Sequence, residues 1–174
     1  MKSDQTLWAS ITGNRPAYVI AEGADAHYGD MARAREMICM AHESGADAIK
    51  FQHHLADLEM LPDVPRSSNM KVPLYEFLKR NALTIEQHIE LADFASAQGI
   101  TYLCTPFSST AAVELQEQIG LPAYKIGSGE LTDLPTLGVV ADFGQPMIVS
   151  TGMADVSEID ATYSFLMQRS VRLV

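Results

Sequence analysis

The sequence has few cysteines, no long apolar run and no cluster of basic residues. Its two cysteines, Cys39 and Cys104, form neither a disulfide framework nor a CxxC motif, and reduced thiols in a cytoplasm are the simplest explanation. No stretch approaches the roughly 18 apolar residues of a membrane span, and residues 1–14 carry no signal-peptide core. The net charge is −10, without the basic face of a nucleic-acid binder. We therefore expect a cytoplasmic protein with no nucleic-acid or membrane partner.

Five short apolar runs alternate with helical patterns along the 174 residues. Apolar residues make up 47% of the chain and charged residues 20%, as in an ordinary globular domain. The runs are too short and too apolar for half-exposed strands, and they are typical of parallel strands buried on both faces. They occupy residues 18–21, 46–51, 101–104, 123–126 and 146–150, and a sixth begins at 171–174.

Amphipathic helices are expected between these runs, with capping residues at their ends. Thr84 and Gln87 fit a capping box, Asp155 and Glu158 open the last helix, and Gly45 ends the first. The repeated order of strand, loop, helix and glycine predicts βαβ units. The helices are expected at residues 30–44, 84–98, 108–120, 135–144 and from 155 onward.

Two α/β architectures satisfy this order, a doubly wound open sheet and a (β/α)₈ TIM barrel. No GxGxxG motif follows the first run, and polar residues follow nearly every run, as in a barrel that collects functional groups at one face. The barrel is favoured, but it takes about 250 residues. We expect residues 1–174 to be the N-terminal portion of a barrel, with about the first five to six β/α units. Open sheet edges then make the isolated chain aggregate or pair with another copy.

Residues 52–83 form one long connection. It contains Pro62, Pro65 and Pro73 and a short helical pattern at 74–80. A connection of this length beside strand ends is often a lid or a binding loop. A surface excursion without a role explains the segment equally well at this point.

Two lysines stand at equivalent strand ends. Lys50 lies in Ala-Ile-Lys-Phe-Gln and Lys125 in Ala-Tyr-Lys-Ile-Gly. Because alternate residues of a strand point to opposite faces, a lysine between two apolar residues faces the barrel interior. A lysine is costly there unless an anion meets it, so the two indicate a phosphate or carboxylate ligand. Pairing with an inward Glu22 or Glu130 is the alternative.

The segment from Lys125 to Glu130 is the densest motif. Gly127 and Gly129 let the backbone approach a ligand closely, and Ser128 adds a hydroxyl donor. Such a loop after a strand suits phosphate. Glu130 is then the candidate proton carrier beside that ligand.

Polar side chains also follow the other strands. Ser150 follows the fifth run and Thr105 the third, and each can bond a ligand or cap a loop. Glu22 and His27 frame the loop after the first run. A glutamate at a strand end suits sugar hydroxyls or a cation, whereas His27 is either a ligand-binding or a loop-packing residue.

The remaining histidines give less evidence of a functional site. His53 and His54 invite a metal interpretation, but adjacent residues of an extended segment point apart, so no metal site is expected from them. His42 and His88 lie inside predicted helices and are expected at the surface.

Together and in order, these motifs resemble the N-acetylneuraminate (sialic acid) synthases and their legionaminate, pseudaminate and spore-coat polysaccharide relatives. The similarity covers about residues 18–165, nearly the whole chain. Its motifs are Ile20-Ala-Glu, His27-x-Gly-Asp30, Gly45-Ala-Asp-Ala-Ile-Lys-Phe-Gln52, Thr105-Pro-Phe107, Pro122-Ala-Tyr-Lys-Ile-Gly-Ser-Gly-Glu-Leu-Thr132 and Ser150-Thr-Gly-Met153.

The resemblance implies a C–C bond-forming transferase of carbohydrate biosynthesis. Such enzymes condense phosphoenolpyruvate with an open-chain N-acylated aldose, typically N-acetylmannosamine, to give a nine-carbon 2-keto sugar acid and phosphate. Residues that hold phosphoenolpyruvate in the family match Lys50, Thr105, Lys125, Ser128 and Ser150. Residues around the sugar and the reacting carbons match Glu22, Gln52 and Glu130.

The resemblance also implies a divalent cation, Mn²⁺ or Mg²⁺, that acts as a Lewis acid. Its ligands are expected beyond residue 174, so no metal ligand is assigned within this chain. The last barrel strands and a C-terminal antifreeze-like domain are likewise expected to be absent, and the complete protein is expected to form a homodimer. We therefore do not expect this chain alone to be a competent catalyst.

Three departures from the family pattern leave the accepted sugar open. Ala26 stands where the family usually has Asn, His53 where it has Thr, and Cys104 where Ser is common. Two alternatives also stay open. One is a barrel aldolase that uses Lys125 as a Schiff base, which requires a lowered lysine pKa. The other is a truncated, non-catalytic barrel fragment.

Overall fold

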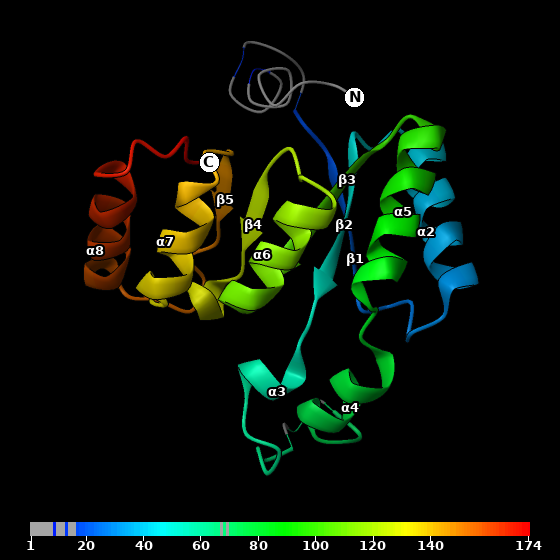
Figure 1. Ribbon diagram of the computed structural model, residues 1–174, viewed down its shortest axis with the longest axis horizontal. Coiled ribbons are helices and arrows are strands. Elements are labelled where there is room, and N and C mark those ends of the chain that lie inside the picture. The colour runs from blue at the N-terminus through cyan, green and yellow to red at the C-terminus, as the bar shows by residue number, and fades with distance from the viewer. Residues whose placement is uncertain (1–8, 10–12, 14–16, 67, 69) are drawn as a thin grey trace.

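The computed structural model describes residues 9, 13, 17–66, 68 and 70–174 of the chain. Five strands alternate with helices in the predicted order (Figure 1). The elements are β1 (Ile20–Ala24), α2 (Met31–Glu43), β2 (Ala48–His53), α3 (Ala56–Glu59), α4 (Leu74–Asn81), α5 (Ile85–Gln98), β3 (Thr101–Pro106), α6 (Ser109–Gln118), β4 (Tyr124–Ile126), the 3₁₀ turn η1 (Ser128–Glu130), α7 (Leu134–Asp142), β5 (Met147–Val149) and α8 (Val156–Met167).

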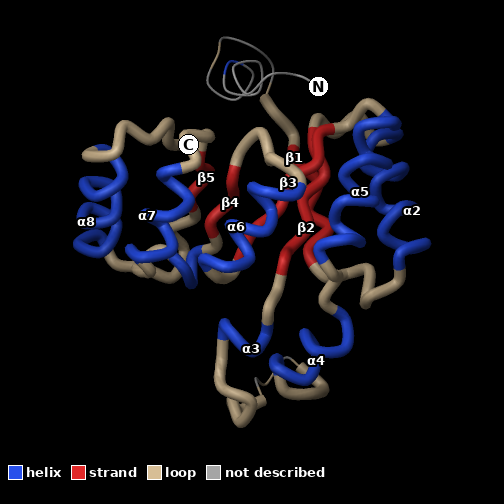
Figure 2. The backbone as a smooth tube through the Cα atoms, viewed as in Figure 1, coloured by secondary structure: helices blue, strands red, loops and turns tan. Residues whose placement is uncertain are grey.

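All strand pairs are parallel, as expected for βαβ units. The strands form two sheets with the orders β1-β2-β3 and β4-β5, and Figure 2 shows the strands at the centre with helices packed around them. A parallel bridge between Met147 and Leu173 marks the start of the predicted sixth run. The fold is thus an α/β barrel arrangement that is not closed within the described residues.

The two sides of the strands carry different cores. Ile49 and Phe51 of β2 and Tyr102 of β3 belong to the large core beneath the helices, here called the outer side. Ala48 and Leu103, at the alternate positions of the same strands, belong to a small separate core with Ala123, which directly precedes β4, and this side is here called the inner side. Side chains of a strand alternate between faces, so this division fixes where every other residue of these strands points.

Local capping explains where the helices begin and end. The Thr84 side chain accepts a hydrogen bond from the Gln87 N–H while the Gln87 side chain accepts one from the Thr84 N–H, so the predicted capping box is confirmed. Asp155 and Glu158 form the same box at α8. Gly45 follows α2 with φ +79°, a conformation that favours glycine.

The connection after β2 is folded rather than open. It contains the predicted helix α4 and also α3, which the sequence does not predict, and Figure 1 shows both standing off the carboxyl end of β2. Asp57 of α3 accepts hydrogen bonds from Tyr75 at 2.5 Å and Lys79 at 2.9 Å. The ring of Phe77 meets Tyr28 of the loop after β1 edge-on, with 5.8 Å between centroids. The segment that follows His54, residues 55–83, is here called the excursion.

Both cysteines are free thiols, and Cys104 is fully buried on the outer side. Within the described ranges, no helix combines the length and the apolar character that crossing a bilayer requires.

Candidate functional site

Four predicted site residues share the inner side of the strands. Lys50 and Gln52 stand two and four residues after Ala48 of β2. Thr105 stands two residues after Leu103 of β3, and Lys125 stands two residues after the alanine that directly precedes β4. Because side chains alternate, all four project inward near the carboxyl ends of their strands. The inward direction predicted for both lysines is therefore confirmed.

Lys50 forms an ion pair with Glu22, its partner across the β1–β2 register. The lysine is only 6% exposed, whereas the Glu22 side chain is 52% exposed. The alternative in which an inward glutamate neutralises a lysine thus holds for Lys50. An ammonium group has three donors, so this pair leaves Lys50 able to bind a further anion.

Lys125 lies beside Ser150 and close to the other lysine. Its Nζ donates to Ser150 Oγ at 2.6 Å and to the carbonyl oxygen of Ile126. Burial lowers the pKa of Lys125, and the positive charge of Lys50 lowers it further, against the opposite effect of Glu22 and Glu130. The two ammonium groups therefore act on each other across one region of the inner side.

Glu130 folds back over the strand end. Residues 128–130 form the 3₁₀ turn η1, which brings the Glu130 carboxylate over Gly127, where any Cβ would overlap with Oε2. That Oε2 atom is buried and has no hydrogen-bond partner among the described residues. Burial raises the pKa of Glu130, which suits a group that holds and releases a proton.

Thr105 supplies a further buried donor. The residue is 2% exposed, and its Oγ1 has no hydrogen-bond partner within the described part of the chain. The Ser150 N–H bonds to the Ile126 carbonyl, which sets the Ser150 side chain beside the end of β4. The inner side thus gathers cations, hydroxyls and carboxylates, a composition that suits an acidic, phosphate-bearing substrate.

His27 is not among the side chains that this side gathers. It is fully buried, its Nδ1 accepts a hydrogen bond from the Gly29 N–H at 2.9 Å, and its ring lies 5.7 Å from that of Phe51 on the outer side. A role of His27 in substrate binding stays a prediction, and its buried Nε2 has no hydrogen-bond partner among the described residues. His27 packs the loop after β1, which was the alternative for this residue.

The expectation that His88 lies at the surface is wrong. His88 is a fully buried residue of α5, its Nδ1 lies 2.7 Å from Tyr102 Oη, and its ring meets His53 with 4.8 Å between centroids. His53 Nε2 in turn lies 2.7 Å from Glu114 Oε2. We refer to Glu114, His53, His88 and Tyr102 as the outer histidine network. His42 is exposed, as expected.

His54 is a site neighbour that sequence reasoning missed. His53 and His54 do point to different partners, and His54 Nδ1 lies 2.7 Å from Glu59 Oε2 on the excursion. Its Nε2 lies 3.3 Å from Gln52 Oε1. The available signal was its position two residues after Gln52, which continues the inward series of β2.

The described residues do not by themselves suit the divalent cation that the family resemblance implies. No group of three or more His, Cys, Asp or Glu side chains among them is arranged to hold a metal ion. The nearest approach is the set around His54, in which Asp25 and Glu59 are already bonded to the imidazole.

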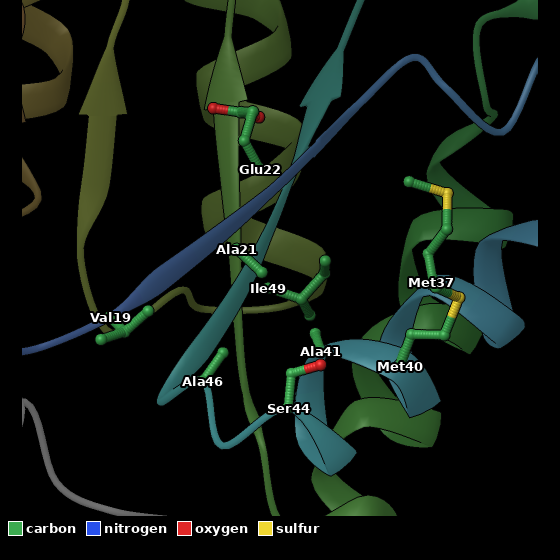
Figure 3. A pocket seen from close by; sticks show the side chains of 9 residues that line it. All are labelled: Val19, Ala21, Glu22, Met37, Met40, Ala41, Ser44, Ala46 and Ile49. Carbon is green, nitrogen blue, oxygen red and sulfur yellow. The ribbon is translucent and has the colours of Figure 1, made fainter.

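A hollow lies at the open edge of the β1-β2-β3 sheet, and Glu22, the ion-pair partner of Lys50, is one of its lining residues. Figure 3 shows it between β1 and α2, with Val19, Met37 and Met40 among its apolar lining residues. Val19 is 52% exposed and Met40 58% exposed. This exposure agrees with a barrel that is open at β1.

Comparison with known proteins gives consistent matches. The NeuB family matches residues 37–174. An uncharacterized protein of Methanocaldococcus jannaschii is 39% identical over 145 residues, which cover 83% of this chain and 40% of that protein. The N,N'-diacetyllegionaminic acid synthase of Legionella pneumophila is 36% identical over 148 residues, covering 82% of this chain and 41% of the synthase.

Solved structures agree with the sequence matches. The N-acetylneuraminic acid (sialic acid) synthetase of Leptospira borgpetersenii superposes with a TM-score of 0.82 and 27% identity, covering 92% of this chain and 53% of that one. The chain therefore spans about half the length of that structure, and about two fifths of the two relatives above.

Proposed function

The chain belongs to the NeuB family, and from that premise we propose that it forms part of a phosphoenolpyruvate-dependent synthase of nine-carbon 2-keto sugar acids. The observation that supports this function most is the pair of inward lysines, Lys50 on β2 and Lys125 on β4, each near the carboxyl end of its strand. Phosphoenolpyruvate carries a carboxylate and a phosphate. Its negative charge therefore offsets the repulsion between the two ammonium groups.

The second substrate is proposed to be an open-chain N-acylated aldose such as N-acetylmannosamine. One similar protein is named for legionaminic acid and one similar structure for sialic acid, so both products are reasonable. Ala26 and His53 depart from the family pattern, and they are the positions at which the choice of sugar is best examined.

The proposed reaction joins the enol carbon of phosphoenolpyruvate to the aldehyde carbon of the sugar. Water then adds to the cationic carbon that bears the phosphate, and C–O cleavage of the resulting intermediate releases inorganic phosphate and leaves the 2-keto acid. Lys50, Lys125, Thr105, Ser128 and Ser150 are proposed to hold phosphoenolpyruvate, and Glu22 and Gln52 to contact the sugar.

Glu130 is the proposed proton carrier in this reaction. Its buried Oε2, without a partner among the described residues, and its pKa, raised by burial, favour a carboxyl group that takes up and releases a proton. A divalent cation, Mn²⁺ or Mg²⁺, is proposed to bind through residues other than those described.

Phosphate release tests the proposal directly. Protein extended to the length of its relatives is incubated with phosphoenolpyruvate, N-acetylmannosamine and Mn²⁺, and inorganic phosphate and the 2-keto acid are measured together. We expect equal amounts of the two products, and none when the sugar is omitted. Phosphate release that does not depend on any N-acylated aldose contradicts the proposed function.

A Schiff-base aldolase is the second candidate, because the pKa of Lys125 is lowered by burial and by Lys50. Borohydride reduction in the presence of pyruvate separates the two functions. A synthase forms no imine, so its mass stays unchanged. A covalent pyruvyl adduct on Lys125 supports the aldolase instead.

We propose that residues 1–174 act as the N-terminal portion of a cytoplasmic, homodimeric enzyme whose later strands and C-terminal antifreeze-like domain lie elsewhere. The isolated chain is expected to be inactive, since Glu22 is half exposed where a closed barrel would shield it. Assay of the isolated chain beside the extended protein tests this. The same preparation, run on a sizing column, tests the expected self-association of its open edges.

A further inference from the structure

His54 joins several segments at the rim of the inner side. Its Nδ1 lies 2.7 Å from Glu59 Oε2 of α3, and its Nε2 lies 3.4 Å from Asp25 Oδ2 of the loop after β1. The same Nε2 is 3.3 Å from Gln52 Oε1. The ring stacks on Phe107, which follows β3, with 4.1 Å between centroids and 21° between planes. One side chain thus joins two segments that are distant in sequence, at Asp25 and Phe107, to its own neighbours Gln52 and Glu59.

Both ring nitrogens of His54 face carboxylates, so both act as donors and the ring carries a positive charge. The His54 side chain is 7% exposed, that of Glu59 is 5% exposed and that of Asp25 is 15% exposed. Burial alone lowers the pKa of His54, but hydrogen bonds and charges from Asp25 and Glu59 outweigh burial and raise the pKa to about 9.

We propose that His54 is a positioning residue that fastens the loop after β1 and the excursion to the carboxyl end of β2, and thereby orients Gln52 toward the sugar. The fastening rests on geometry alone. The part that concerns the sugar rests on the proposed function, because only that function places a sugar beside Gln52.

Other contacts of the excursion, one between its helices α3 and α4 and one with the loop after β1, are more exposed than those of His54. Asp57 is 63% exposed and Lys79 is 49% exposed in their ion pair, and Tyr28, which meets Phe77, is 58% exposed. Exposed ion pairs contribute little to stability, whereas removal of one partner from a buried pair leaves an uncompensated buried charge and is strongly destabilising. The His54 contacts are therefore expected to fix the position of α3, where the excursion begins.

The groups that face His54 define its charge. Asp25 and Glu59 are the carboxylates in contact, and the positive charge of His54 also lowers the pKa of Glu130. The same charge lowers the pKa of His88 across the sheet. Removal of the imidazole thus changes the surroundings of the proposed proton carrier as well as the position of Gln52.

His54→Phe tests the proposal, since it keeps a ring to stack on Phe107 but has no donors. The matched control is His42→Phe, at an exposed histidine of α2. We expect amide hydrogen exchange in α3 and α4 to become at least about 10-fold faster in His54→Phe and unchanged in the control, a change of about 1.4 kcal/mol in local opening. Unchanged exchange in both variants overturns the fastening.

Asp25→Asn keeps the imidazole and removes one charged partner, so it serves if His54→Phe does not fold. We expect a smaller increase in exchange and, by NMR, a lower titration midpoint for His54 than the value of about 9 in the parent chain. A parent midpoint near 6.5 overturns the proposal.

Kinetics of the extended protein separate this inference from the proposed function. We expect His54→Phe to raise KM for N-acetylmannosamine at least 10-fold and leave KM for phosphoenolpyruvate within about 2-fold. Faster exchange in a protein that never consumes phosphoenolpyruvate supports the fastening and contradicts the synthase. An active synthase whose sugar KM does not change in His54→Phe contradicts the orientation of Gln52.

Discussion

His54 and His88 are both buried, yet their pKa values move in opposite directions. His88 lies on the outer side, where burial and the neighbouring histidines lower its pKa well below the usual value. His54 lies at the rim of the inner side, where Asp25 and Glu59 overcome the effect of burial. Burial alone therefore does not decide the charge of a histidine in this protein, and the nearest carboxylates do.

The same contrast separates the two sides of β2. Lys50 and Gln52 point inward, where Lys50 pairs with the half-exposed carboxylate of Glu22. His53 and Phe51 point outward into a sealed layer beneath the helices. We infer that the inner side serves binding and the outer side serves stability, and the predictions that follow test that division.

The largest effect is expected from Lys125→Met on the inner side. It removes a cation proposed to hold phosphoenolpyruvate, so kcat/KM in the extended protein is expected to fall at least about 10³-fold, or about 4 kcal/mol. Lys71→Met, at an exposed lysine, is the control and is expected to change kcat/KM less than 2-fold. If Lys125→Met retains a tenth of the activity, the inner side does not bind the substrate through this lysine.

Glu59→Gln is expected to have the next largest effect, and on stability. It leaves the buried His54 with one carboxylate in place of two, and we expect the free energy of unfolding to fall by about 2–4 kcal/mol. Urea unfolding at fixed protein concentration measures this. The control is Glu76→Gln in α4, an exposed i,i+4 pair with Arg80, for which a loss below about 0.5 kcal/mol is expected. Equal losses of unfolding free energy in the two variants would show that burial of the His54–Glu59 pair does not increase its contribution to stability.

His88→Leu is expected to cost about 1–3 kcal/mol, because it leaves the buried Tyr102 hydroxyl without its partner. Adding Tyr102→Phe removes that hydroxyl too, and the double variant is expected to recover most of the loss. Neither change is expected to alter KM in the extended protein, since both side chains lie on the outer side. A KM increase in either variant contradicts the inference that the outer side serves stability and not binding.

The strand pattern was the part of this fold most accessible from sequence. Alternation alone predicts that Lys50 and Lys125 face inward, since each lies between apolar neighbours. Capping is equally local, and the structure confirms the predicted box at Thr84 and the predicted helix start at Asp155. These features depend on residues within a few positions of each other, so no tertiary information is needed.

The burial of His88 and the partners of His54 were not accessible in the same way. His88 lies in a helix, and the residues next to it in sequence do not indicate that it contacts Tyr102 and His53. Asp25 is 29 residues from His54 and meets it only because β1 and β2 pair in parallel. Contacts of this kind follow from tertiary packing, and a single sequence carries no direct sign of them.

The pH dependence of stability is the finest test of the contrast between the two histidines. A group whose pKa is lowered on folding binds its proton more readily in the unfolded state, so His88 reduces stability as the pH falls below about 6.5. A group whose pKa is raised on folding acts in the other direction. His54 contributes fully below about pH 6.5, and its contribution is lost as the pH rises toward 9.

Subtracting variants from the parent isolates each histidine from the other titrating groups. The free energy of unfolding of the parent minus that of His88→Leu is expected to decrease from pH 6.5 to 5, by at most about 1.4 kcal/mol per pH unit for one proton. The parent minus His54→Phe is expected to be constant near pH 6 and to decrease between pH 7 and 9. If both differences in unfolding free energy change in the same direction with pH across the whole range, the carboxylates around His54 do not set its charge. The contrast between the two histidines would then lose its physical basis.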